Sequence, residues 1–332
     1  MHNRQVKLLA SGKYLPKRKL TSADMDRLLG VPDGWVQKKS DVAVRHFIED
    51  ETASYMGAQA AREAIRQAGL RPGDIDCIVC ASGTQEQPIP CNAALLQKEL
   101  GPEWSGIPAF DMNSTCLSFL VALDVISYMI EASRYRRVLI VSSEIASTGL
   151  NWQDKQSAAL FGDGAAAVIA VRAEETESSR IAHAAIRTYA AGAELSEIRG
   201  GGSRLHATAC NGENRDDFLF RMDGQAIYRM ASKLLPDFTK ELLDAAGARM
   251  ADFRLVIPHQ GSAMAMRLLR RKLGIAEEQL LYITPNHGNT IAASIPMGLH
   301  EAMKQGRIRR GDRILLLGTS AGLTLGGMII DY

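Results

Sequence analysis

An internal repeat is the feature that most constrains how this chain can fold. Four segments of the first half recur in the same order in the second half, at offsets of about 173 to 178 residues. The matching pairs are residues 55–70 and 234–248, 74–83 and 252–261, 95–101 and 268–274, and 137–141 and 313–317. Four ordered matches at nearly one spacing indicate a duplicated structural unit, and such a repeat decides the architecture before any single motif does.

Each unit alternates short apolar strands with helices of about ten or more residues. This pattern predicts an α/β protein whose parallel or mixed sheets are covered by helices. Two such sheets, with helices between and outside them, make a five-layered body with pseudo-twofold symmetry. We divide it into residues 1–172 and residues 173–332. Because open α/β sheets bind ligands at their carboxyl edges, we expect the functional residues on matching loops of the two halves.

The composition excludes several classes of protein. Of the 332 residues, 46% are apolar and 23% charged, and 39 basic side chains face 37 acidic ones. This near balance gives no electrostatic reason to bind nucleic acid or an anionic membrane. No apolar run approaches the ~18 residues of a membrane helix, and no signal-peptide core begins the chain. Five cysteines without a regular framework argue against a disulfide-stapled secreted domain, so we expect a cytoplasmic protein.

Cys116 is a candidate nucleophile. It follows a cluster of Asn, Ser and Thr and precedes an apolar stretch with helical spacing, which together predict the N-terminus of a buried helix. Unpaired N–H groups and the helix dipole are expected to stabilise a thiolate there and lower a reference pKa of ~8.5. The alternative is a small cysteine that only fills the core.

Cys77 and Cys80 form a Cys-x-x-Cys pair, a spacing that suggests a redox or zinc site. On a strand, however, residues three apart point to opposite faces, so the two sulfurs do not converge. We therefore predict that both are core residues.

The second half contributes two further candidates. His259 follows the predicted strand 255–258, at its carboxyl edge, and the first half has Ala81 near the same repeat position, so the fold itself does not require an imidazole. Asn289 lies in a run of small residues after Gly288, which lets the backbone approach a ligand closely. A structural role is the alternative for a histidine at a strand end.

Three glycine-rich segments carry weaker signals. Residues 161–168 lack the Gly-Lys-Ser/Thr ending of a phosphate loop and predict a turn that leads into a strand of small residues. Residues 200–203 predict a flexible loop. Residues 315–327 predict a strand, a bend of small residues and a second strand, and the N–H groups of the bend are placed to face a ligand.

Taken together, five motifs resemble the β-ketoacyl-acyl carrier protein synthase III family of thiolase-fold condensing enzymes, in family order and over nearly the whole chain. The motifs are Trp35 with residues 45–47 (RHF), residues 109–116 (AFDxxxxC), residues 161–166 (FGDGAA), residues 256–260 (VIPHQ) and residues 287–296 (HGNTxAASxP).

The resemblance implies a thiolase fold of two βαβαβαββ halves in a five-layered αβαβα body, a homodimer, and a catalytic triad of Cys116, His259 and Asn289. Cys116 would take an acyl group from an acyl-CoA, with backbone N–H groups of Cys116 and Ala321 as the oxyanion hole. His259 and Asn289 would then stabilise the enolate left when a malonyl thioester of CoA or acyl carrier protein loses CO2. No metal or redox cofactor is implied, and the thioesters are substrates.

The resemblance also implies residues that bind substrate. Trp35 would stack on the CoA adenine, with Lys39 and Lys155 where well-known members carry arginine, so nucleotide recognition is expected to be looser. Ser262 replaces an asparagine that contacts pantetheine. Ile89 falls near a phenylalanine of short-chain enzymes that reaches into the partner's acyl pocket. Because isoleucine is smaller, we expect an acyl donor longer than acetyl.

Basic side chains cluster at Arg267, Arg270, Arg271 and Lys272. They form either a solvated helix face or a docking patch for an acidic acyl carrier protein. Three other functions stay open: a non-decarboxylative enzyme that joins two acyl chains head to head, a synthase of quinolone- or resorcinol-type secondary metabolites, and a non-catalytic acyl-binding partner subunit. The intact Cys, His and Asn argue against the last.

Overall fold

The computed structural model describes residues 3–332, so the first two residues of the predicted first half lie outside it. The strands are β1 (Val6–Tyr14), β2 (Arg18–Thr21), β3 (Val44–Phe47), β4 (Cys77–Cys80), β5 (Ala109–Asp111), β6 (Arg137–Glu144), β7 (Gly164–Arg172), β8 (Arg180–Thr188), β9 (Ser196–Glu197), β10 (Arg221–Met222), β11 (Leu255–Pro258), β12 (Arg313–Ser320) and β13 (Thr324–Asp331). The helices are α1 (Ser22–Leu29), α2 (Trp35–Ser40), α3 (Ala53–Ala68), α4 (Asn92–Leu100), α5 (Ser118–Glu131), α6 (Lys155–Ala158), α7 (Gly224–Ala245), α8 (Ala263–Leu273), α9 (Thr284–His287) and α10 (Ser294–Lys304).

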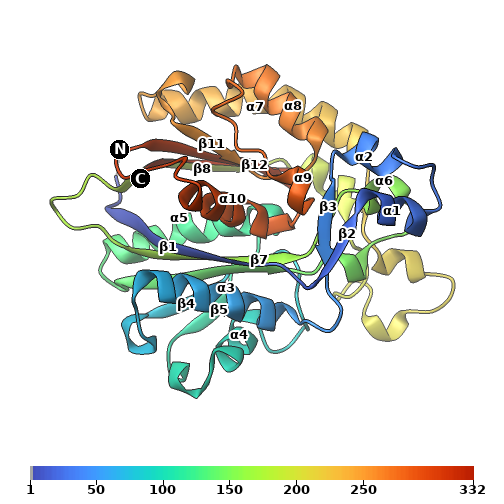
Figure 1. Cartoon of the computed structure of the whole chain (residues 1–332), viewed down its shortest axis with the longest axis horizontal. Helices are drawn as coiled ribbons and strands as arrows, with labels where there is room; N and C mark the ends of the chain where they lie inside the picture. Colours follow the sequence, from blue (N-terminus) through green and yellow to red (C-terminus); the bar gives the residue numbers. More distant parts are fainter. Residues whose placement is uncertain (1–2) are drawn as a thin grey trace.

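Five layers stack across the molecule (Figure 1). One outer layer holds α3 and α4, which pack on a five-stranded sheet of order β1-β7-β6-β4-β5. The middle layer holds α5 and α10, which contact both sheets. A four-stranded sheet of order β11-β12-β13-β8 follows, and α7 covers its other face together with α8. The predicted αβαβα body is confirmed.

The two sheets repeat one pairing scheme, which confirms the duplication read from the sequence. β7 lies antiparallel between β1 and β6, and β6 runs parallel to β4. In the second half β13 lies antiparallel between β8 and β12, and β12 runs parallel to β11. The one difference is the fifth strand. β5 pairs with β4, whereas the second half has a single parallel bridge at this place, between Val256 and Leu280, and α9 begins a few residues later at Thr284.

A local turn repeats as well. Asp74 and Asp252 each accept the backbone N–H of the arginine three residues earlier, Arg71 and Arg249, at 2.8 Å in both cases. Each turn leads into the parallel strand of its half, β4 or β11. Since β7 ends at Arg172 and β8 begins at Arg180, our division between residues 172 and 173 stays a prediction for the boundary of the halves.

Two helices begin earlier than their apolar spacing suggests. α3 begins at Ala53 because the Thr52 side chain accepts the Tyr55 N–H as an N-cap. α7 begins at Gly224, ten residues before the predicted segment, because Asp223 caps it by accepting the Ala226 N–H at 2.8 Å. The helix continues through Pro236, which gives up one intrahelical hydrogen bond.

The largest hydrophobic cluster lies between the two sheets. α5 supplies Phe119, Leu120, Leu123, Ile126 and Ile130, all fully buried. Burying side chains of this size contributes roughly 1.5–3 kcal/mol each. This packing holds the N-terminal ends of α5 and α10 at the centre of the molecule.

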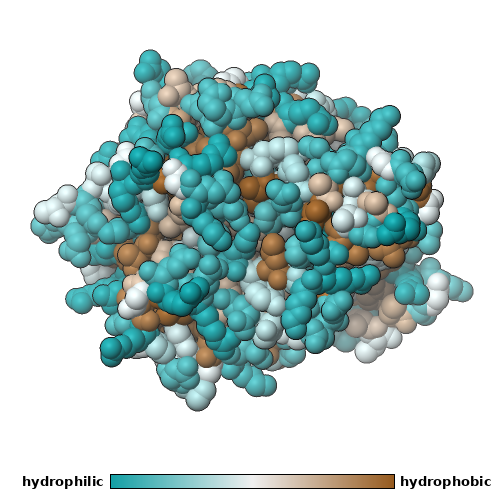
Figure 2. All heavy atoms as spheres, in the orientation of Figure 1, coloured by the Kyte–Doolittle hydropathy of each residue, from teal (hydrophilic) through white to brown (hydrophobic). Residues whose placement is uncertain are grey.

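Hydrophilic residues cover most of the surface seen in Figure 2, and hydrophobic residues appear between them in small groups. Within residues 3–332, no helix has both the length and the apolar character required to cross a bilayer.

The contact between β1 and α3 yields a test of the fold. A Cβ added at Gly12 would lie 2.0 Å from the carbonyl oxygen of Ala60, so Gly12→Ala must push α3 off the sheet. We expect the free energy of unfolding in urea to fall by about 3 kcal/mol. Gly73→Ala is the matched control, because an added Cβ there meets open space. Equal unfolding midpoints for the two variants would contradict this packing.

Candidate active site

Cys116 lies in a single 3-10 turn, Thr115–Leu117, immediately before α5. Thr115 opens the turn at a φ of 46°. Hydrogen bonds tie the turn to the end of β12: the Thr115 and Ser320 hydroxyls lie 2.8 Å apart, and the Ser320 Oγ donates to the Ser114 carbonyl at 2.9 Å. The predicted position at a helix start is therefore correct to within one turn.

The predicted lowering of the Cys116 pKa is wrong. Burial, with a smaller contribution from the carboxyl of Glu144, raises the pKa of this thiol to about 12. The backbone N–H groups of Ala321 and Cys116 act in the opposite direction but do not outweigh the burial. Dipole arguments fail here because desolvation penalises the thiolate more than two N–H groups stabilise it. The same two N–H groups are the ones that the family resemblance assigns to the oxyanion hole.

His259 follows β11 and is 7% exposed. Its Nδ1 lies 2.7 Å from the Ser294 Oγ, which accepts the Gln260 N–H at 3.3 Å. The Ser294 hydroxyl can then donate its proton to Nδ1. Because Nδ1 accepts this hydrogen bond, the proton of the neutral ring lies on Nε2. Burial lowers the pKa of His259 to about 4, so the imidazole is neutral at physiological pH. A Cβ added at Gly261 would lie 3.3 Å from Nε2, so this glycine keeps the side of the proton open.

Asn289 is also 7% exposed, in the turn after α9. Its Oδ1 accepts the Ile291 N–H at 2.9 Å, which turns the amide nitrogen into the available donor. The backbone is fixed on both sides, because the Asn289 N–H donates to Leu160 at 2.9 Å and its carbonyl accepts from Gly162 at 3.1 Å.

Two glycines let the segments that carry these residues meet. A Cβ added at Gly318 would lie 2.8 Å from the His259 Cβ and 3.0 Å from the Leu117 side chain, next to Cys116. A Cβ added at Gly83 would lie 2.9 Å from the Ile291 side chain and 3.2 Å from the Thr115 Cα. The turn of Cys116, the strand end of His259 and the turn that follows Asn289 are therefore in close contact.

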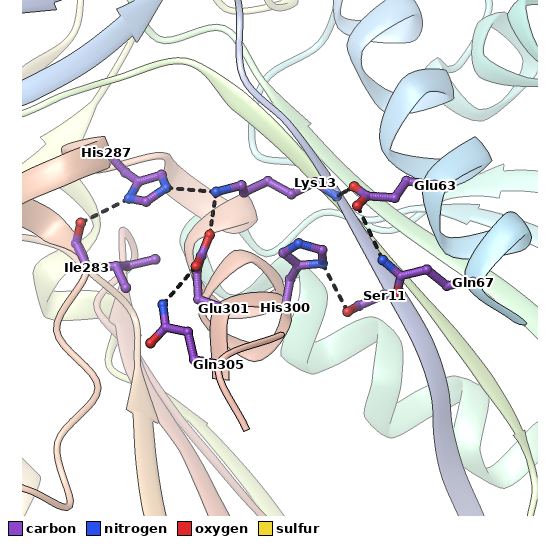
Figure 3. A network of polar contacts seen from close by, with 9 residues as sticks. All are labelled: Ser11, Lys13, Glu63, Gln67, Ile283, His287, His300, Glu301 and Gln305. Carbon is purple, nitrogen blue, oxygen red and sulfur yellow. Dashed lines mark hydrogen bonds and ion pairs between the residues drawn. The ribbon is translucent and has the colours of Figure 1, made fainter. Parts of the chain in front are cut away.

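A polar network surrounds Lys13 and includes His287, which precedes Asn289 by two residues (Figure 3). Lys13 on β1 reaches between His287 and Glu301: its Nζ lies 3.3 Å from His287 Nε2 and forms an ion pair with Glu301. His287 Nδ1 donates to the Ile283 carbonyl at 3.1 Å, and burial lowers the pKa of His287 to about 4. The network attaches α9 and α10 of the second half to β1 of the first half.

The residues predicted to bind the nucleotide gather near α1, α2 and α6. Trp35 begins α2, and the Lys39 Nζ lies 6.0 Å from the centre of its ring. The Lys155 Nζ donates to the Gly30 carbonyl at 3.4 Å, which brings α6 against the connection between α1 and α2. Trp35 is half-buried and both lysines are exposed.

The remaining predicted residues lie on other elements. Ser262 caps α8, and its Oγ accepts the Ala265 N–H at 3.1 Å. Ile89 is 84% exposed. Arg267, Arg270, Arg271 and Lys272 are exposed along α8, where Arg270 pairs with Glu277 at 2.9 Å.

Cys77 and Cys80 are core residues, as predicted. Both are buried on β4, where Cys77 packs between the two sheets with Val79. The sulfur of Cys80 lies 3.4 Å from the Ser82 Oγ, and burial raises the pKa of Cys80 far above its usual range.

Known proteins match this chain over almost its whole length. The family model of the 3-oxoacyl-[acyl-carrier-protein (ACP)] synthase III C terminal matches residues 243–332, and the model of 3-oxoacyl-[acyl-carrier-protein (ACP)] synthase III matches residues 110–190. The β-ketoacyl-[acyl-carrier-protein] synthase III of Aquifex aeolicus is 35% identical over 98% of this chain and 99% of its own length. The chain belongs to the 3-oxoacyl-[acyl-carrier-protein] synthase III family. Its fold is therefore a thiolase fold, and it is an acyltransferase of the condensing type.

Further relatives agree with this family. The synthase III of Clostridium acetobutylicum is 29% identical over 98% of both chains. The crystal structure of the Aquifex aeolicus synthase III superposes with a TM-score of 0.88 at 32% identity, over 98% of this chain and all of that one. OleA of Xanthomonas campestris has a TM-score of 0.86 over 99% of both chains, but at 21% identity the likeness shows the fold alone.

Sequence reasoning missed two polar residues of this site. Ser294 orients His259, and Glu144, which is fully buried at the end of β6, acts on Cys116. The repeat offers one signal for Glu144. β6 and β12 both begin at an arginine, so Glu144 is equivalent to Ser320, the last residue of β12.

The raised thiol pKa predicts how Cys116 reacts in this synthase. Below a pKa of about 12 the thiolate fraction climbs about tenfold per pH unit. We therefore expect the rate of Cys116 alkylation by iodoacetamide to rise from pH 7 to pH 9 without a plateau. Peptide mass spectrometry separates this modification from that of Cys91 and Cys210. A plateau below pH 8 would restore the stabilised thiolate expected from the sequence.

Proposed function

We propose that this enzyme transfers an acyl group from an acyl-CoA to Cys116 and condenses it with a malonyl thioester of acyl carrier protein or CoA to give a 3-oxoacyl thioester. The observation that carries this proposal is the close contact of the segments bearing Cys116, His259 and Asn289 in a chain of the synthase III family. The reaction uses no metal or redox cofactor, and a cytoplasmic location fits it.

In the first half-reaction the Cys116 sulfur attacks the thioester carbon of the acyl-CoA. A new C–S bond forms to Cys116, the bond to the CoA sulfur breaks, and the thiol proton ends on the released CoA. The N–H groups of Cys116 and Ala321 face this sulfur, so they are placed to stabilise negative charge on the thioester oxygen.

In the second half-reaction the malonyl carboxylate leaves as CO2, and its bonding electrons form an enolate. His259 Nε2 and the Asn289 amide nitrogen donate to the enolate oxygen. Both groups are oriented for this role, because Ser294 occupies the other imidazole nitrogen and Ile291 occupies the amide oxygen. The enolate carbon then attacks the acyl group, and Cys116 leaves with a proton from solvent.

Substrate recognition is part of the proposal. Trp35, Lys39 and Lys155 contact the nucleotide of CoA, with lysines that attract phosphate as point charges rather than as planar forks. Ser262 lies at the start of α8 near the pantetheine arm. Arg267, Arg270, Arg271 and Lys272 form the docking patch for an acidic acyl carrier protein, with an attraction that weakens as salt rises.

The enzyme acts as a homodimer. We place Ile89, which is 84% exposed, at the interface, because the family resemblance puts it near a residue that reaches into the partner's acyl pocket. In the dimer this side chain reaches the acyl pocket of the partner and sets its length.

Substitution of the three central residues separates the half-reactions. We expect Cys116→Ala to abolish the acyl-enzyme, and mass spectrometry after incubation with acyl-CoA to find the thioester on Cys116 in the parent protein. His259→Ala and Asn289→Ala should still be acylated but condense 10²- to 10³-fold more slowly, because each loses one donor worth ~2.7–4 kcal/mol. Cys80→Ala is the control and should keep both activities.

Two outcomes would contradict this mechanism. An acyl label on Cys77 or Cys80 would overturn the choice of nucleophile. Product that still forms without malonyl thioester would show that no decarboxylation is required.

Ile89 predicts the donor preference. With isoleucine at this position, we expect turnover with longer acyl-CoAs to exceed that with acetyl-CoA across a panel from acetyl to dodecanoyl. Ile89→Phe should shift the optimum to shorter chains, whereas Ile89→Leu, of equal volume, should leave it in place. A panel in which acetyl-CoA is preferred by the parent protein would refute the longer pocket.

A further inference from the structure

Glu144 is a buried carboxyl group close to Cys116, and it has no role in the proposed mechanism. It ends β6 and has no exposed surface. Its Oε1 accepts the Gly83 N–H at 2.6 Å, and its Oε2 accepts the Thr84 N–H at 2.9 Å and the Thr84 Oγ1 at 2.7 Å. The backbone N–H of Ala292 also faces this carboxyl and acts to lower its pKa. Among residues 3–332 it forms no ion pair with a lysine, arginine or histidine.

The repeat explains why an acceptor is needed there. The turn of Cys116, Thr115–Leu117, has a counterpart in Ile291–Ala293, which also opens at a positive φ, 48°, and also leads straight into a central helix. In this correspondence Ala292 takes the place of Cys116. The N–H of Cys116 faces its own sulfur, at the site where an oxyanion forms, whereas the N–H of Ala292 faces the carboxylate of Glu144. The fold thus builds the same anion-accepting turn twice, and Glu144 fills one copy.

The filled copy controls the orientation of both proposed enolate donors. Ile291, in the turn held by Glu144, donates to Asn289 Oδ1. Ser294 follows the same turn as the first residue of α10 and contacts His259. On its other side the carboxylate holds Gly83, which is wedged between this turn and the turn of Cys116.

We propose that Glu144 is a positioning residue that fixes the His259 and Asn289 donors relative to Cys116, by binding the Gly83–Thr84 loop and the Ile291–Ala293 turn with one carboxylate. The proposal rests on the condensation proposed above. Electrostatics supports it, since the charge of Glu144 raises the pKa of Cys116 and so hinders the thiolate. Because its charge disfavours the Cys116 thiolate, Glu144 contributes to catalysis by positioning the segments that it binds.

The titratable groups near Cys116 separate this role from a structural one. Burial raises the pKa of Glu144 to about 7, so at pH 8 this carboxyl on β6 is mostly charged and acts on the sulfur. Cys80 on β4 feels the same charge, while His259 after β11 is neutral above a pKa of about 4. Glu144→Gln removes the charge and places an amide N–H group among the N–H donors of Gly83, Thr84 and Ala292. We therefore expect two changes of opposite direction in this variant.

The experiment compares the parent enzyme with E144Q, E144D and T84V, and with E51Q as the matched control. Glu51 is likewise a buried carboxylate that accepts two main-chain N–H groups, from Lys17 and Glu49, but it does not contact the site segments. Three rates are measured: alkylation of Cys116 at pH 8, formation of the acyl-enzyme, and condensation with malonyl thioester over a range of concentrations.

In E144Q we expect faster alkylation, acylation within about threefold of the parent rate, and a kcat for condensation about a hundredfold lower at nearly unchanged KM for malonyl thioester, because misplacement by ~1 Å costs about that much. E144D should recover part of kcat because it keeps the carboxylate. T84V, which loses one donor and keeps the charge, should lower kcat several-fold without faster alkylation. E51Q should leave the ratio of the three rates unchanged.

Other results decide against the proposal. Parallel loss of acylation and condensation in E144Q, or condensation equal to that of the parent enzyme, would overturn the positioning role. If E144Q does not fold, T84V with parental kcat overturns it. A parent enzyme that alkylates and acylates but never condenses malonyl thioester would instead refute the proposed function.

Discussion

Two strained turns set the geometry on which this site depends. Thr115 and Ile291 each hold a non-glycine residue at positive φ, 46° and 48°, at the start of a 3-10 turn. A conformation of this kind costs of order 1–3 kcal/mol and persists only where the surroundings leave no alternative. Here the surroundings are α5 and α10, whose buried faces are clamped between two sheets, and Gly83, which leaves no room for either turn to relax. Packing of the core therefore keeps the turn that contains Cys116 in a strained conformation.

Before substrate binds, Cys116 and His259 are both uncharged, because both side chains are buried. Burial raises the pKa of Cys116 to about 12 and lowers the pKa of His259 to about 4, so a thiolate beside an imidazolium is the disfavoured state. In the proposed mechanism, negative charge develops only during the reaction, first on a thioester oxygen and then on an enolate oxygen. Donors that are already fixed, as proposed for His259 Nε2, would stabilise such charge without having to reorganise.

The sequence predicts the layers well and the electrostatics poorly. Repeated apolar strands such as 137–141 and 313–317 are local signals, and both became strands of equal place in their sheets. The early start of α7 and the single bridge at Leu280 depend on one capping aspartate and one short connection, which apolar spacing does not record. The thiol pKa was predicted from a helix end two residues away, whereas its value follows from everything packed around the sulfur. Glu144 was missed because its partners come from segments far apart in the chain.

The asymmetry of the two halves has a physical reason. A duplicated fold brings a duplicated set of inward-facing N–H groups, and a buried N–H without an acceptor costs about 1–3 kcal/mol. Ala292, unlike its counterpart, has no reactive side chain, and its N–H faces the buried carboxyl of Glu144. Cys116 keeps its sulfur, and its N–H is matched there only by a weak acceptor. A strong acceptor at Cys116 would compete with every oxyanion, and a weak one at Ala292 would leave the turn beside His259 and Asn289 free to move. Catalysis at the turn of Cys116 therefore requires that the N–H of the equivalent turn, at Ala292, be occupied by Glu144.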